Sequence, residues 1–396
     1  MSQTLQEKIK QLAHEFAPAC IAIRHHLHAN PELSYEEFET SQFVQSKLAE
    51  LNIPFKVLAQ TGVVGIIEGK NPHKRVVALR ADMDALPIQE ENDVPYKSTK
   101  PGIMHACGHD VHTSCLIGAA KILVATKDEW EGTVKLIFQP GEEKNPGGAS
   151  YMIQEGVLEN PAPQSIYALH VHSGLQVGQL SFRGGMVMAS ADELYITIRA
   201  KGGHAAAPHL TADTIYIASQ LVVLLQQVVS RQNNPFNPTV LSITSIKGGN
   251  TTNVIPSEVK MMGTFRAMDE TWRFKAHALM LQQAKALVEG LGAELDFKID
   301  VGYPFVMNDE TLTAAAKAKA VQFFGESKIE ETELRMGAED FAYYTHKVPG
   351  CFFRLGAGNI AKGITIGVHT PTFNIDEDAI EIGIAAMALF GATNGE

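Results

Sequence analysis

The chain has 396 residues, 45% of them hydrophobic, and this length predicts a two-domain protein with a large core rather than a small binding module. With 33 lysines and arginines against 44 acidic residues the formal net charge is -11, which argues against nucleic acid or an anionic membrane as a partner. We expect a cytoplasmic protein with reduced thiols, because no signal peptide or membrane-span pattern occurs and the four cysteines are scattered.

The first 50 residues predict two helices. Apolar residues recur at helical spacing over residues 5–21, and the dipeptide Asn30-Pro31 ends the pattern. Ser34 and Glu37 have the spacing of a capping box for a second helix that continues through Leu51. Three histidines near the end of the first helix would complement its dipole, namely His25, His26 and His28.

Short β-branched runs follow, alternating with a helical pattern at residues 111–126. The runs that we expect to form strands are residues 62–68, 75–81, 133–139 and 165–171. Strands that alternate with helices predict an α/β domain built on a mostly parallel sheet.

Polar side chains gather where these predicted strands end. Asp82 and Asp84 follow one strand, Glu142 and Glu143 follow another, and His170 lies at the end of a third. In parallel sheets, ligands bind beyond the carboxyl ends of the strands. The sequence therefore predicts a functional site at this edge of the sheet.

The loop of residues 104–113 carries a cysteine, three histidines and an aspartate. Cys107 and His109 lie two residues apart, so in an extended loop both can point to the same side and bind a first-row metal ion. The alternative is a buried thiol beside an ordinary core histidine. His369, at the end of a later apolar run, is a further candidate ligand.

A second domain is predicted near the middle of the chain. Three strands and two helices are expected there, at residues 194–200, 211–230, 240–246, 257–266 and 271–289. These five elements fit the first part of a β-α-β-β-α-β set, and so a ferredoxin-like domain of residues 189–301 inserted into an α/β domain of residues 1–188 and 302–396. For the final part we expect a helix at 309–324, a strand near 364–368 and a helix from Asp376.

Eight segments together resemble the M20 metallopeptidases, and within them the amidohydrolase subgroup of hippurate hydrolases, N-acetyldiaminopimelate deacetylases and indoleacetyl-amino acid hydrolases. The matching segments span nearly the whole chain in the order of the family and are residues 27–33, 78–87, 104–113, 139–143, 202–205, 253–256, 263–266 and 336–341. The resemblance implies a zinc-peptidase-like catalytic domain with an inserted domain that acts as a lid and in dimerisation.

The resemblance also implies a centre with two divalent metal ions, of zinc, manganese, nickel or cobalt. The implied ligands are Cys107 as the bridge between the ions, His109, Glu143, His170 and His369. Many relatives have a His-x-Asp motif where this chain has Asp82-Met83-Asp84, so Asp82 and Asp84 are expected to hold ligands rather than to bind metal.

For catalysis the resemblance implies Glu142 as the general base that activates a metal-bound water. It suggests that His204 stabilises the tetrahedral oxyanion, from the same chain or from the second chain of a homodimer or homotetramer. Asn253 and Arg266 would bind the α-carboxylate of the substrate, which a guanidinium matches in shape.

The function that these inferences predict is the metal-dependent hydrolysis of an N-acyl amino acid into a carboxylic acid and a free amino acid. Three alternatives remain at this stage. The first is a metallo-carboxypeptidase or dipeptidase with the same site, and the second is a hydrolase with Cys107 as the nucleophile. The third is a non-catalytic binding protein that retains the fold.

Overall fold

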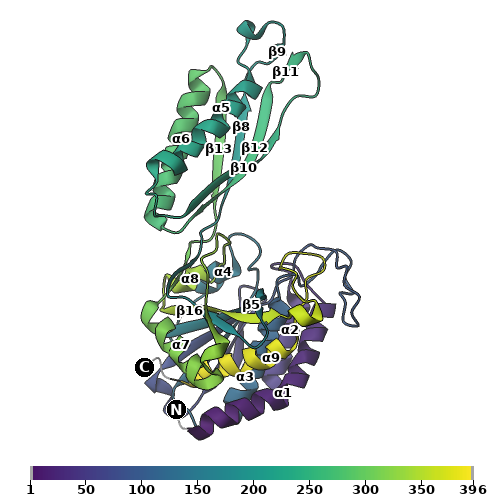
Figure 1. The fold of residues 1–396 in the computed structure, drawn as a ribbon, viewed down its shortest axis with the longest axis vertical. Coiled ribbons are helices and arrows are strands. Elements are labelled where there is room, and N and C mark those ends of the chain that lie inside the picture. The colour runs from purple at the N-terminus through teal and green to yellow at the C-terminus, as the bar shows by residue number, and fades with distance from the viewer. Residues whose placement is uncertain (1–2, 394–396) are drawn as a thin grey trace. The chain divides into compact units, whose positions relative to one another are not determined.

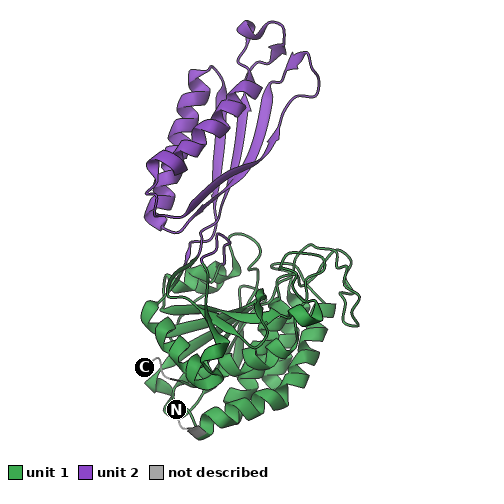
Figure 2. Ribbon diagram, viewed as in Figure 1, with its two compact units in different colours: residues 1–187, 307–333, 340–396 green, residues 188–306, 334–339 purple. Residues whose placement is uncertain are grey.

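The structure is a computed structural model that describes residues 3–393. The chain forms two compact units, shown in two colours in Figure 2. The first unit contains the residues up to Val187, residues 307–333 and the residues from Asp340 onward, and the second contains residues 188–306 and 334–339. Among residues 3–393, the structure contains no helix that is both long and apolar enough to cross a membrane.

The first unit is built on an eight-stranded sheet in the order β1-β2-β4-β3-β5-β16-β6-β15. Its strands are β1 (Phe55–Leu58), β2 (Gly62–Glu68), β3 (Val76–Asp82), β4 (Thr133–Gln139), β5 (Ser165–Gln176), β6 (Leu180–Phe182), β15 (Ile329–Glu331) and β16 (Gly350–Gly358). The four central strands β4, β3, β5 and β16 are parallel to one another, whereas β1 and β2 add antiparallel pairs at one edge. A separate pair is formed by β7 (Gly185–Met188) and β14 (Val306–Asn308).

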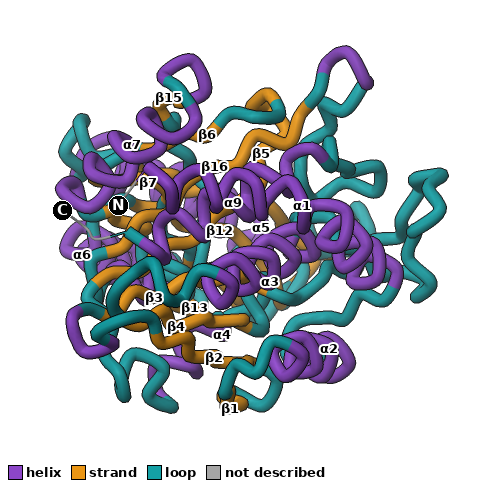
Figure 3. Tube along the Cα trace, turned by 90° about the horizontal axis from the view of Figure 1, so that it is seen from below, coloured by secondary structure: helices purple, strands orange, loops and turns teal. Residues whose placement is uncertain are grey.

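Helices cover the sheet (Figure 1). They are α1 (Gln3–Ala29), α2 (Phe38–Glu50), α3 (His109–Ala125), α4 (Gly148–Gln154), α7 (Glu310–Phe324), α8 (Ala342–Thr345) and α9 (Asp378–Ala392). Figure 3 looks onto α1, α3 and α9, which pack against one another over the central strands. The central strands are buried along nearly their whole length and are mostly apolar, with buried charged residues such as Lys135 and Arg354 within them.

The second unit is a four-stranded antiparallel sheet, in the order β10-β12-β8-β13, with its own apolar core. Its main elements are β8 (Asp192–Arg199), α5 (Thr214–Gln227), β10 (Thr239–Lys247), β12 (Glu258–Ala267), α6 (Glu270–Gly290) and β13 (Glu294–Val301). This β-α-β-β-α-β order is the one predicted from the sequence. Two short strands, β9 (Gly203–His204) and β11 (Val254–Ile255), pair beyond the sheet.

The predicted capping box of the second helix is wrong. The carboxylate of Glu32 accepts hydrogen bonds from the amides of Glu39 and Thr40 at the start of α2, and Glu37 makes no capping hydrogen bond. Ser34 instead donates to a carboxylate oxygen of Asp84, 2.6 Å away. The spacing of Ser34 and Glu37 therefore predicted a local cap, but the side chain of Ser34 binds a distant residue instead.

The strand expected near residues 364–368 is also absent from the structure. Only Ile364 pairs there, in an isolated bridge with Asn359, and the residues that follow run as a loop. The amide of His369 donates to the carbonyl of Ala106 at 2.7 Å, so the loop is held by the segment that carries Cys107. A tertiary contact, rather than strand pairing, therefore sets the conformation of this loop.

Candidate metal centre

The centre lies at the carboxyl ends of the parallel strands. Asp82 ends β3 beside Gln139, which ends β4, and His170 lies on the neighbouring strand β5. Gly108, the residue before α3, has φ 91°, and a Cβ there would lie 2.4 Å from a methyl group of Val171. Only glycine allows this close approach, which brings Cys107 and His109 up to the strand ends.

Two groups of potential ligands meet at Cys107. Atoms of Cys107, His109 and His170 all lie within 4.8 Å of one another, and so do atoms of Cys107, Glu143 and His369. The Cys107 sulfur, 3.4 Å from Nε2 of His170, belongs to both groups. The structure thus brings together all five residues that the sequence identified as ligands, with the cysteine common to both halves.

The hydrogen bonds of two histidines leave one nitrogen of each directed at the centre. Nδ1 of His109 lies 2.9 Å from the carbonyl oxygen of Asp84 and 3.2 Å from its carboxylate, so it is the protonated nitrogen. Nε2 of His109 is buried and has no hydrogen-bond partner within residues 3–393. His170 donates from Nδ1 to the carbonyl of Val171 at 2.8 Å, which directs its Nε2 toward Cys107.

The surroundings of Cys107 fit a cation. Burial and the charges of Glu143, Glu142 and Asp82 raise the pKa of the Cys107 thiol well above its ordinary value. A thiolate ligand at this position therefore needs nearby positive charge, which a divalent ion provides. Sulfur, imidazole and carboxylate together are a donor set for zinc and other first-row metals.

Glu143 and His369 complete the second group. The amide of Glu143 donates to the Asp84 carboxylate at 2.9 Å, and its Oε1 lies 3.2 Å from Nε2 of His369. This contact with Glu143 raises the pKa of His369, although burial opposes it. His369 has a left-handed backbone with φ 63°, which is unusual for a residue with a side chain and marks a held conformation.

Glu142 lies beside the centre and is 6% exposed. One of its carboxylate oxygens is 4.0 Å from Nε2 of His109, and it forms a further group of close acidic and imidazole atoms with His109 and Glu143. A carboxylate at this distance is placed to exchange a proton with a small molecule bound among these side chains.

Asp82 and His112 form a buried layer behind the centre. Asp82 accepts from Arg80 at 2.5 Å and from Nδ1 of His112 at 2.6 Å, and Nε2 of His112 accepts from the amide of Val171. Both nitrogens of His112 are therefore occupied within the protein. Although burial would raise the pKa of Asp82, the charges of His109, Arg80 and His112 lower it well below its ordinary value.

Sequence reasoning missed the partners that hold this layer. Arg80 also donates to Gln139 and, at 2.8 Å, to Asp340, which in turn accepts from Gln139 and from the amide of Ala149. All of them except Ala149 lie within the segments that carry the family resemblance, but no local pattern indicates which distant side chain each would meet.

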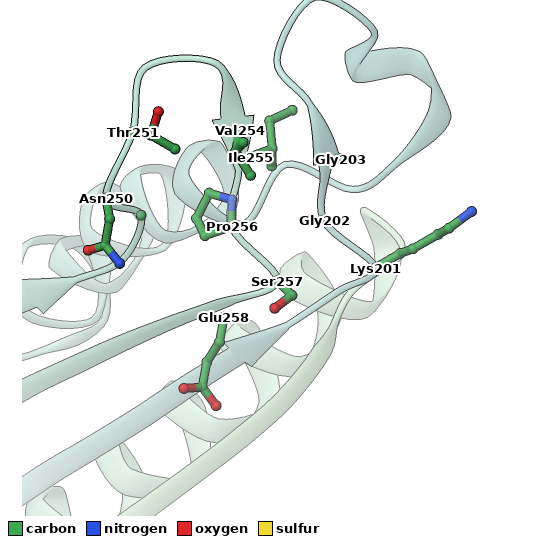
Figure 4. A pocket seen from close by; sticks show the side chains of 11 residues that line it. Lys201, Gly202, Gly203, Asn250, Thr251, Val254, Ile255, Pro256, Ser257 and Glu258 are labelled. Atoms are coloured by element: carbon green, nitrogen blue, oxygen red, sulfur yellow. The ribbon is translucent and has the colours of Figure 1, made fainter.

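The second unit carries the remaining candidates. His204 and Asn253 are neighbours, because β9 and β11 pair His204 with Val254, and Nδ1 of His204 accepts from the amide of Ala206 at 3.1 Å. A pocket lies beside them, and Figure 4 shows the residues that line it, including Lys201 and Asn250.

Arg266 lies at the other end of this unit. It is the second-last residue of β12, whereas Glu258 at the start of β12 lines the hollow beside His204. They are eight positions apart along the strand, a distance of about 26 Å. Burial lowers the pKa of Arg266, and its Nε donates to the hydroxyl of Thr264 at 3.1 Å. Within one chain, Arg266 and Asn253 therefore do not meet at one carboxylate.

Comparison with known proteins agrees with this geometry. Residues 78–392 match the family model described as peptidase family M20/M25/M40. Thermostable carboxypeptidase 2 of Saccharolobus solfataricus is 40% identical over 97% of this chain and 98% of its own length. An N-acyl-L-amino acid amidohydrolase of Geobacillus stearothermophilus is 44% identical over 76% of this chain and 81% of its own length.

A solved structure shares this fold. The Bacillus subtilis YXEP protein, described as a dinuclear metal binding peptidase from the M20 family, is 34% identical over 96% of this chain and 98% of its own. Its TM-score with this structure is 0.82. The similarity covers nearly all of both chains. The whole chain, rather than one segment of it, therefore resembles that family.

Proposed function

Because this chain belongs to the peptidase family M20/M25/M40 and is therefore a hydrolase of amide or peptide bonds, we propose that it cleaves N-acyl-L-amino acids with the help of two divalent metal ions. Cys107, His109 and His170 would hold one ion, and Cys107, Glu143 and His369 the other. The observation that carries the proposal is the pair of ligand groups sharing Cys107, with the Glu142 carboxylate beside them.

The residues around the proposed metal ions have separate roles in the reaction. Bound divalent ions supply Lewis acidity, which polarises an amide carbonyl and lowers the pKa of a water. Glu142 removes a proton from the attacking water and returns it to the leaving amine, while Asp84 holds His109 in the required tautomer and Asp82 orients His112 behind the centre. Arg266 binds the carboxylate of the amino acid.

A nucleophilic Cys107 is disfavoured by its surroundings. The thiol lies within reach of His170, but reactive cysteines need a lowered pKa, and the carboxylates around Cys107 raise it. A carboxypeptidase with the same site is the second candidate, because a relative of that name is 40% identical over nearly the whole chain.

We also propose that His204 and Asn253 act on the site of a second copy of the chain. The pocket beside them is lined by Glu258, which lies about 26 Å along β12 from Arg266, and this exceeds the length of an N-acyl amino acid with a short acyl group. A homodimer or homotetramer in which the second unit mediates contact between copies would supply them from the neighbour.

The experiment that tests the function is release of free amine from N-acetyl, N-benzoyl and longer N-acyl amino acids, with unblocked dipeptides in parallel. Chelator-treated protein is compared with protein reloaded with zinc or manganese, and with a Glu142→Gln variant. We expect metal-restored cleavage of the N-acyl substrates, reduced by roughly 10²–10⁴-fold in Glu142→Gln at unchanged metal content. Cleavage confined to dipeptides would favour a carboxypeptidase or dipeptidase. Full activity in Glu142→Gln would rule out Glu142 as the general base.

A further inference from the structure

The segment between α1 and α2, residues 30–37, which we call the connector, contacts both sides of the candidate metal centre. Leu33 pairs with Ala85, and the hydroxyl of Ser34 donates to the carboxylate of Asp84 at 2.6 Å. The same carboxylate accepts from Glu143 and lies near His109. The connector thus supports a residue that holds two of the proposed ligands.

Glu37 links the connector to the loop that carries Glu142. Its side chain is completely buried, and its Oε1 accepts the amide of Gly141 at 2.7 Å and the amide of Tyr35 at 2.9 Å. Its Oε2 accepts the hydroxyl of Thr61 at 2.9 Å. The bond to Gly141 holds the peptide unit between Pro140 and Gly141, one unit before the peptide that joins Gly141 to Glu142.

Tyr35 holds the other end of the same loop. Its hydroxyl donates to the carbonyl of Lys144 at 2.6 Å and accepts from the amide of Gly147 at 3.1 Å. The ring lies against Gly141, where a Cβ would come within 2.3 Å of it. Tyr35 and Gly141 both have left-handed backbones, with φ 69° and 59°. Two residues of the connector therefore bind the loop at Gly141, Lys144 and Gly147.

The burial of Glu37 is not explained by the helix that follows it, since Glu32 accepts the amides at the start of α2. Burial and the charge of Asp84 raise the pKa of Glu37 to about 7, so this position is unfavourable for the charged group. An unfavourable buried carboxyl whose hydrogen bonds join the connector, Thr61 and the loop at Gly141 is typical of a side chain kept for positioning.

We propose that Glu37 and Tyr35 are positioning residues, which hold the loop of residues 141–147 so that the carboxylate of Glu142 stays where the reaction needs it. This inference rests on the proposed function in assigning the base to Glu142. The hydrogen bonds themselves exist in the resting protein and can be tested without the reaction.

The test compares Glu37→Ala, Glu37→Gln and the exposed neighbour Glu36→Ala as a control, in full-length metal-loaded protein. In Glu37→Ala we expect kcat to fall on the order of 100-fold, with KM and metal content unchanged, because a misplaced catalytic group costs that much. Glu37→Gln restores most of kcat, since its amide oxygen still accepts from Gly141 and the Thr61 hydroxyl can accept from its NH2 group. If Glu37 only stabilised the fold, Glu37→Ala would lower Tm without a selective loss of kcat.

Hydrogen exchange of the Gly141 and Gly147 amides gives a second readout. We expect faster exchange at Gly141 in Glu37→Ala and a smaller increase at Gly147 in Tyr35→Phe, because the Gly147 amide also donates to the carbonyl of Lys144 at 3.0 Å. We expect wild-type rates in Glu36→Ala. If the wild type hydrolyses none of the substrates, the proposed function fails, and the exchange rates alone decide the role of the connector. Unchanged protection of Gly141 in Glu37→Ala, or Glu37→Gln as inactive as Glu37→Ala in an active enzyme, would overturn the proposal.

Discussion

At the scale of single residues, the role of each histidine follows from what its two nitrogens contact. His109 and His170 donate from Nδ1 to oxygen atoms and direct Nε2 toward the cysteine. His112 lies in the same cluster, yet it donates to Asp82 and accepts from Val171, so no nitrogen remains for a metal ion. The hydrogen bond made behind a histidine, rather than its distance from the centre, identifies a ligand.

Cys107 provides a prediction at this scale. Because its sulfur belongs to both ligand groups, we expect Cys107→Ala to weaken the binding of both proposed ions. Metal affinity should fall by more than about 100-fold, which is more than the loss caused by removing a hydrogen-bond partner of a ligand. Metal per chain is measured after dialysis against buffered zinc. The buried cysteine of β16 serves as the control, since Cys351→Ala removes a thiol and leaves the ligands intact. Full metal content in Cys107→Ala would rule out the shared ligand.

At the scale of elements, α1 is fastened to α3 by buried charges. The Asp110 carboxylate accepts from Arg24 at 3.0 Å and from His28 at 2.8 Å, and the other nitrogen of His28 lies 3.1 Å from Glu90. His28 lies in the last turn of α1, as expected, but it is 1% exposed and contacts two buried carboxylates there. Burial alone would lower the pKa of His28, but hydrogen bonds to Asp110 and Glu90 raise it.

The raised pKa of His28 predicts how stability depends on pH. Its contribution is fully present below the unfolded pKa of about 6.5 and is lost as pH rises through the higher native pKa. We therefore expect His28→Gln to lower the free energy of unfolding by about 3 kcal/mol at pH 6 and by less at pH 9. Urea denaturation of chelator-treated protein at both pH values measures the difference. An equal loss of unfolding free energy at both pH values would mean that His28 is uncharged in the native protein.

The elements themselves were largely predictable, and the errors share one cause. Periodicity identifies β2, β4 and α7 closely, because each buries a face with the period of its own secondary structure. The capping box and the strand near 364–368 fail because distant residues hold those segments, Asp84 in one case and Ala106 in the other. The contact between Arg80 and Asp340 spans 260 residues, which no local pattern encodes.

The candidate site was predictable to a different degree. The five candidate ligands and Glu142 follow from the resemblance and from the strand ends, and the structure brings these residues together. The connector was not predictable, because Tyr35 and Glu37 act through backbone amides of a loop more than 100 positions away. Backbone donors have no signature in the sequence of the residue that offers them.

At the scale of the whole molecule, the proposed division between copies leads to a mixing experiment. Glu142→Gln and His204→Ala each inactivate the homo-oligomer, but a mixed dimer contains one site with both Glu142 and the partner's His204 intact. If the copies exchange freely, a 1:1 mixture recovers about a quarter of wild-type activity. Activity is measured after mixing under dissociating conditions and dilution into metal-containing buffer.

The control for this prediction is the Glu142→Gln variant mixed with wild type. That mixture sets the scale at half of wild-type activity, with or without exchange, because every wild-type chain still receives a His204 from any partner. Exchange of copies is shown separately, by recovery of untagged chains together with affinity-tagged ones after the same mixing. If His204 acts within its own chain, mixing the two variants recovers nothing, although exchange is demonstrated.

The order of strands in the sheet has a consequence for synthesis of the protein. β5 ends at Gln176, but its parallel neighbour β16 begins only at Gly350, after the entire second unit. On the ribosome, one edge of the strand that carries His170 stays without its partner until that unit has been made. An apolar strand with an open edge recruits other chains. We therefore expect nascent chains that stop before Gly350 to aggregate or to engage chaperones, which makes completion of the sheet the step that commits the chain to fold.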